Sequence, residues 1–143
     1  MARELLKRST LLLLLGAIAA TTLSGCAATR ENKRADDLTT SVLLYLQSLR
    51  WGDYPTAIAM LQHPDGTIPP SNATRLEGLR ITTFNFEVLG GQPGDTEAVM
   101  TATMQYYWED QAAVRKIGQR SRWWWSEESQ RWFMDDTLPD FKR

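Results

Sequence analysis

The sequence predicts an α+β domain in which an N-terminal helix pair packs on a four-stranded antiparallel meander sheet. Two observations predict this fold class. Apolar residues recur at helical spacing as far as Leu61, and from Thr82 onward apolar and polar residues alternate as in half-buried strands. Because short turn-like segments separate the alternating runs, consecutive strands are expected to pair antiparallel, with the helices on one face.

Length and composition set limits on the kind of protein. The chain has 143 residues, and its first 25 are typical of an export signal, which leaves 118 residues for one domain. A hydrophobic fraction of 43% and a charged fraction of 23% exclude wholesale disorder. The remaining chain holds 13 basic and 16 acidic residues, and this net charge of −3 argues against nucleic-acid binding. One cysteine allows neither an intrachain disulfide nor a cysteine metal cluster.

Residues 1–25 have the layout of a secretory signal. Arg3, Lys7 and Arg8 form a positive start, and an uncharged apolar stretch runs from Leu11 to Ala20. That stretch is short for a membrane span, which needs about 20 apolar residues. The pattern therefore predicts export.

The signal ends in Leu23-Ser24-Gly25-Cys26, which resembles the lipobox of bacterial lipoproteins. The resemblance implies cleavage between Gly25 and Cys26, a diacylglyceryl group on the Cys26 sulfur and an acyl chain such as palmitate on the new amino group. Several acyl chains make a durable anchor, since each buried methylene contributes about 0.8 kcal/mol. Two alternatives are a soluble secreted protein cut after Ala28, and an uncleaved signal anchor.

The residue after the cysteine bears on the final location. Ala27 stands where an aspartate in Gram-negative lipoproteins resembles an inner-membrane retention signal. The resemblance therefore implies a cell-envelope protein on the periplasmic side of the outer membrane, with the membrane itself as a partner. Residues 26–34 are expected to be the lipidated N-terminus and a short tether, and residues 35–143 the domain.

The two helices are expected on either side of Gly52. Asp53 is a suitable N-cap for the second helix, which Pro55 opens and Pro64 ends. The apolar residues of the first helix are Ala35, Leu38, Val42, Tyr45, Leu46 and Leu49, and those of the second are Ala57, Ile58, Met60 and Leu61.

The strand register follows from the apolar pattern and the turns. Thr82, Phe84, Phe86 and Val88 are expected on one face of the first strand. A two-residue turn at Asp110-Gln111 would place Met104 opposite Ile117. A second turn at Glu128-Ser129 makes these facing pairs: Trp125 with Trp132, Trp123 with Met134, Arg122 with Asp135, and Trp124 with Phe133.

With this element order, residues 35 to 141 resemble small members of the cystatin-like and NTF2-like superfamily, in which a curved sheet wraps around N-terminal helices as a cone. Some enzymes of that superfamily use an Asp–His pair in the cone. The resemblance thus offers His63 with Asp53 or Asp65 as the site of a small hydrolase or isomerase. The alternative is a surface histidine at a helix C-terminus.

The tryptophans suggest a candidate binding face. Because strand side chains alternate, Trp124 must point away from the core that Trp123 and Trp125 share. There are two interpretations: long arginine side chains cover such rings, or the face binds a partner. The residues expected on this face are Trp124, Phe133, Tyr107, Arg120 and Arg122.

No catalytic, metal or cofactor site is expected. Asp135 and Asp136 are adjacent and so point to opposite faces of a strand, and the glycine-rich stretch 90–94 lacks the following helix that cradles phosphate. The sequence therefore predicts a non-enzymatic, lipid-anchored envelope protein whose domain binds a protein partner or a small apolar ligand. The alternatives are the His63 enzyme and a purely structural envelope component.

Overall fold

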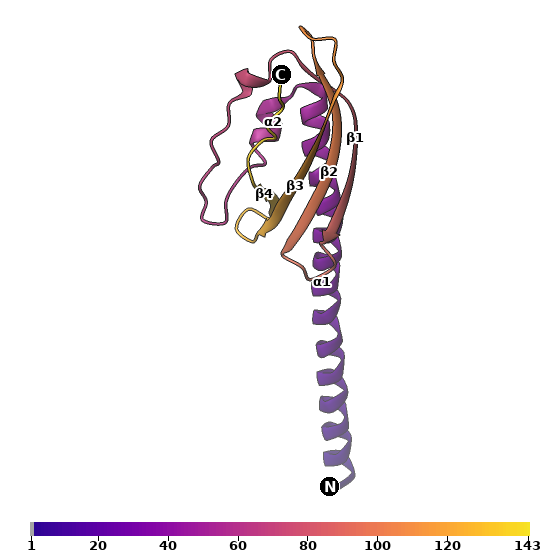
Figure 1. Cartoon of the computed structure of the whole chain (residues 1–143). Coiled ribbons are helices and arrows are strands. Elements are labelled where there is room, and N and C mark those ends of the chain that lie inside the picture. The colour runs from indigo at the N-terminus through magenta and orange to yellow at the C-terminus, as the bar shows by residue number, and fades with distance from the viewer. Residues whose placement is uncertain (1) are drawn as a thin grey trace.

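The structure is a computed structural model that describes residues 2–143, with side chains described for residues 27–143. Its elements are helix α1 (Ala2–Trp51), helix α2 (Tyr54–Ile58), a 3₁₀ turn (Ala73–Leu76), and strands β1 (Leu79–Gly90), β2 (Glu97–Trp108), β3 (Arg115–Ser126) and β4 (Arg131–Asp135). The strands form one antiparallel sheet in chain order, which curves around the C-terminal part of α1 (Figure 1). The α+β fold is confirmed.

The N-terminal signal lies outside the part of the chain whose side chains are described. The predictions for residues 1–25 and for the side chain of Cys26 therefore stay predictions. Residues 27–34 were expected to be a tether, and the structure has them as a continuous part of α1. Within the described residues, no helix is long and apolar enough to cross a membrane.

Helix α1 ends where the sequence predicts. Gly52 has φ +75°, a left-handed conformation that glycine adopts without strain, and its N–H donates to the Leu49 carbonyl at 3.3 Å. The next residue, Asp53, caps α2 by accepting a hydrogen bond from the Thr56 N–H at 3.3 Å. The helix pair is therefore joined by a tight turn.

Helix α2 is shorter than predicted. It ends at Ile58, and the expected continuation to Leu61 is wrong. The chain instead runs beside β4: the Gln62 N–H donates to the Met134 carbonyl at 3.1 Å, and the Met134 N–H donates to the Met60 carbonyl at 2.8 Å. A five-residue helix has little stability of its own, so pairing with the sheet edge determines the conformation.

The predicted pairing of the last two strands is confirmed in full. Trp125 lies opposite Trp132, Trp123 opposite Met134, Trp124 opposite Phe133 and Arg122 opposite Asp135. Met104 also lies opposite Ile117 as predicted. The two-residue turn expected at Asp110-Gln111, from which the register of β2 with β3 was predicted, is wrong, because residues 109–114 form a longer connection.

Strand β1 departs from simple alternation. The register with β2 shifts between Ile81 and Thr83, which marks a bulge. One extra residue reverses the side-chain parity, so Thr82 is exposed although it was predicted to share a face with Phe84.

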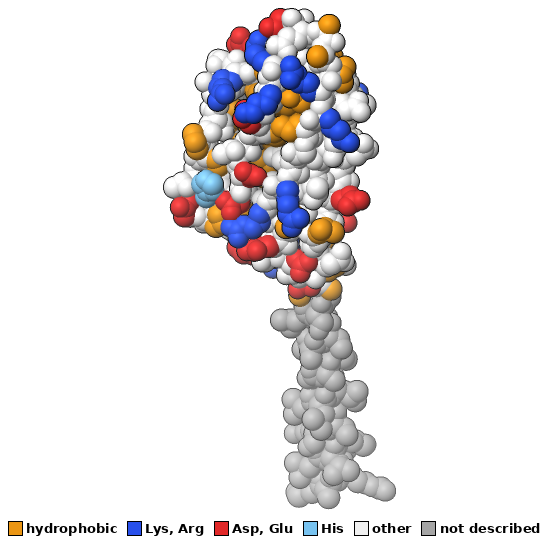
Figure 2. Space-filling view, in the orientation of Figure 1, with side chains coloured by type: hydrophobic (Ala, Val, Ile, Leu, Met, Phe, Trp, Pro, Cys, Tyr) orange, Lys and Arg blue, Asp and Glu red, His pale blue; other side chains and the backbone are white. Residues whose placement is uncertain are grey.

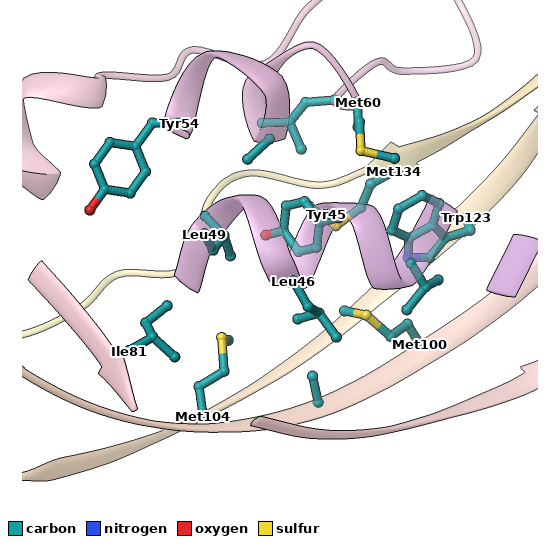
Figure 3. Close-up of a cluster of buried hydrophobic side chains, with 14 of the residues drawn as sticks. Tyr45, Leu46, Leu49, Tyr54, Met60, Ile81, Met100, Met104, Trp123 and Met134 are labelled. Carbon is teal, nitrogen blue, oxygen red and sulfur yellow. The ribbon is translucent and has the colours of Figure 1, made fainter. Parts of the chain in front are cut away.

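The inner face of the sheet and α1 enclose a packed core (Figure 3). Side chains from α1, such as Leu46, meet Met100 and Met104 from the sheet, and all three are fully buried. The C-terminal segment covers one end of this core: the Phe141 ring contacts the Tyr106 ring with centroids 5.0 Å apart. Side chains thus fill the space between the helices and the sheet.

Candidate functional site

The outer face of the sheet, away from α1, carries an aromatic pair. The rings of Trp124 and Phe133 stack with centroids 5.6 Å apart and planes inclined by 29°. The indole N–H of Trp124 donates to the Gln62 carbonyl at 2.7 Å, so the segment after α2 lies at the N–H edge of this ring. Trp124 is therefore half-buried, and Phe133 is 9% exposed.

The five residues predicted for the binding face do not all come together. Arg122 lies across from Asp135, next to the row of Trp124 and Phe133, and Arg120 is two residues before Arg122 on β3. Tyr107 lies elsewhere: Trp124 pairs with Glu97, ten residues from Tyr107 along β2, which at about 3.3 Å per residue is about 30 Å. We call Trp124, Phe133, Arg120 and Arg122 the aromatic–arginine face.

A charged cluster adjoins this face and centres on Asp135. Its Oδ1 lies 2.5 Å from Nδ1 of His63, and its Oδ2 accepts a hydrogen bond from Nε of Arg122 at 3.0 Å. Glu97 lies 3.7 Å from the other side of the Arg122 guanidinium. The hydrogen bond from His63, and next the contact with Arg122, hold the pKa of Asp135 below its usual range.

The enzyme alternative paired His63 with a different carboxylate, that of Asp53 or Asp65. Asp53 caps α2, and Asp65 accepts hydrogen bonds from the Thr67 N–H and hydroxyl at 2.9 and 2.6 Å. Sequence reasoning missed the pair of His63 with Asp135 because it took residues 59–61 as helix. The predicted pair of Arg122 and Asp135 was the one available signal, since it placed this carboxylate on the outer face.

The chemistry open to His63 follows from its position. The imidazole is 39% exposed, and the chain's one histidine is visible at the surface beside acidic and basic side chains (pale blue in Figure 2). A carboxylate at Nδ1 fixes the ring and leaves Nε2 free to accept or donate a proton. The pair lies on the outer surface of the domain, and not in the cone between helices and sheet.

Two grooves on the domain lie away from this cluster. One, of about 890 Å³, runs between the 3₁₀ turn and the C-terminal segment and is lined by residues such as Arg75, Leu138 and Lys142. The other, of about 550 Å³, adjoins the connection between β2 and β3 and includes Tyr107. Neither groove contains His63.

A metal site needs several His, Cys, Asp or Glu side chains close together. Among the residues whose side chains are described, no group of three or more His, Cys, Asp or Glu residues is arranged to hold a metal ion.

Comparisons with known proteins identify no relative of this chain. No protein-family model, no curated protein and no solved structure matches the chain.

Proposed function

We propose that this protein is a lipid-anchored component of the bacterial cell envelope, held through Cys26 on the periplasmic side of the outer membrane. The lipobox sequence and the apolar segment before it support the anchor. Helix α1 is joined to the sheet at Arg34, whose carbonyl accepts a hydrogen bond from the Trp132 indole N–H at 2.8 Å. Eight helical residues after Cys26 span only about 12 Å, so the domain would lie close to the lipid surface.

We further propose that the domain is a non-catalytic binding module that recognises an envelope partner through the aromatic–arginine face. One observation carries this proposal: a stacked Trp124–Phe133 pair lies on the outer face of a rigid sheet with arginines beside it. Tryptophan and arginine are the residues most enriched at energetically important interface positions. Because the core is filled, an apolar ligand inside the cone has less support than a partner on this face.

The NTF2-like or cystatin-like cone remains our proposal for the superfamily. The order of helices and strands and the curved sheet around α1 support it. The packed core and the outward position of His63 distinguish this chain from the enzymes of that superfamily whose Asp–His pair lies inside the cone.

The binding proposal is tested by photo-crosslinking in intact cells. A photoreactive residue at Val99, which lies opposite Arg122, should form a discrete protein adduct, and the same residue at Thr40 on exposed α1 should not. Trp124→Ala should strongly reduce the adduct, because a central aromatic anchor is worth about 2 kcal/mol, or about thirtyfold in affinity.

Tyr107→Ala is the matched control, since it removes an aromatic ring at the distant end of the same sheet. Its adduct should equal that of the wild type. Equal adducts from Val99 and Thr40, or an adduct that Trp124→Ala leaves unchanged, would contradict the proposed binding face.

The second candidate function is a surface hydrolase or isomerase, and the contact of His63 with Asp135 at 2.5 Å is the observation that favours it. Turnover of an ester, phosphoester or enolisable substrate that both His63→Ala and Asp135→Asn abolish would establish it. A purely structural role remains the third candidate. It predicts neither turnover nor a specific adduct at Val99.

A further inference from the structure

A glycine in the middle of β3 is not explained by the fold. Gly118 is exposed, lies opposite Thr103, and is not among the glycines with positive φ. A Cβ atom built on it would come no closer than 3.9 Å to a neighbour, the Ala102 carbonyl oxygen. Glycine weakens a strand interior and often marks a place where a ligand approaches the backbone closely.

Two cationic side chains flank this glycine on the same face of the sheet. Lys116 and Arg120 are each two residues away, about 7 Å along the strand, and both are exposed. Within residues 27–143 neither takes part in an ion pair. Arg122, the next cation along β3, is by contrast bound to Asp135 and close to Glu97.

Hydroxyl groups from β2 complete the surroundings. Thr103 lies opposite Gly118 and Thr101 lies opposite Arg120. Neither hydroxyl has a hydrogen-bond partner in the described part of the chain. The nearest outward carboxylate in these cross-strand rows is that of Glu87 on β1, which lies opposite Thr101 of β2. Glu87 is therefore two strands, or about 10 Å, from Arg120.

We propose that the surface around Gly118 binds a phosphate or carboxylate group of an anionic ligand, with Lys116 and Arg120 as its charged partners and the two threonines as hydroxyl donors. The missing side chain leaves room for the anion between the two cations. Hydrogen bonds that Lys116 and Arg120 donate to an anion are charge-assisted, and such bonds are stronger than those between neutral groups. This inference rests on the proposed binding role of the outer face, and it names the chemistry that the face recognises.

The test uses the full chain in nonionic detergent micelles at low salt. Titration with inorganic phosphate and then pyrophosphate should shift the ¹⁵N-amide signals of Gly118 and Thr103 saturably. Gly118→Val should abolish the saturable shift at Thr103 because it fills the space. Since valine favours strands, the same variant should unfold at an equal or higher urea concentration, which separates loss of binding from loss of folding.

Charge variants provide the controls. Arg120→Gln should weaken pyrophosphate binding at least tenfold, whereas Lys33→Gln, an equal charge change on α1, should leave it unchanged. The phosphate titration requires no protein partner, so failure of the proposed partner surface, read from the adduct at Val99, and failure of this site are distinguishable. A linear, non-saturating shift, or wild-type affinity in Gly118→Val, would overturn the proposal.

The source of the anion is separated by reconstitution into vesicles. If replacing phosphatidylcholine by phosphatidylglycerol weakens pyrophosphate binding, lipid headgroups compete for the site. If the affinity stays the same, the ligand is a soluble or polymeric anion. Both results support an anion site, and they assign it to different ligands.

Discussion

The carboxylate of Asp135 connects three parts of the domain. It accepts hydrogen bonds from His63, which follows α2, and from Arg122 on β3, while its own backbone belongs to β4. Because both contacts favour the ionised form, they lower the pKa of Asp135. A carboxyl group with a lowered pKa in the folded state stabilises that state above its unfolded pKa, and this stabilisation is lost as pH falls through the folded pKa.

The pH dependence of stability tests this role. Asp135→Asn should lower the free energy of unfolding at pH 7, and its difference from wild type should begin to shrink near pH 4 and close as pH falls further. The measurement is urea unfolding followed by tryptophan fluorescence at several pH values. Asp36→Asn, which removes the same charge from exposed α1, should have little effect at pH 7. A difference that does not depend on pH would show that the contacts of Asp135 are not electrostatic.

At the scale of elements, the strand pairs were the most predictable part of the fold. The pairing of Trp125 with Trp132 followed from the alternation and the expected turn at Glu128-Ser129, because a slip by one residue would have turned these rings to solvent. The length of α2 was not predictable, because Met60 and Leu61 fit either a helix or an edge strand until β4 is present to pair with them. The contact of His63 with Asp135 depends on that segment, so it was missed for the same reason.

The turn between β1 and β2 is held by close packing against α1. Gly91 has φ +72°, and a Cβ atom built on it would lie 2.1 Å from Cδ2 of Leu38. Gly66 has a similar φ of +84° and nothing within 4 Å of such an atom. The two glycines therefore share the conformational requirement and differ in the space available.

Substitution of these glycines by alanine separates the two effects. Both variants should lose about 1–2 kcal/mol, because alanine is strained in the left-handed region. Gly91→Ala should lose about 1–3 kcal/mol more of its free energy of unfolding, because the added methyl group meets Leu38. Urea midpoints of the two variants measure the difference. Equal losses would mean that the turn between β1 and β2 does not pack against α1 as described.

For the whole molecule, helix α1 connects the proposed anchor at Cys26 to the domain. Arg34 is bound to the β3–β4 end of the sheet by three contacts: its carbonyl accepts from the Trp132 indole, its guanidinium pairs with Glu127 at 3.1 Å, and that group also lies over the Trp125 ring. If Cys26 carries lipid, this end of the domain faces the membrane. The aromatic–arginine face then stands at the side of the domain, accessible to a partner in the same envelope.

The most direct test of the account is the intact mass of the mature protein purified from membranes. We predict an N-terminus at Cys26, with the mass of a diacylglyceryl group and one amide-linked acyl chain added. Cys26→Ser should accumulate as the uncleaved precursor without lipid. A mature protein that begins at Thr29, or an unmodified chain that retains residues 1–25, would contradict the lipid anchor and the membrane-proximal binding role that depends on it.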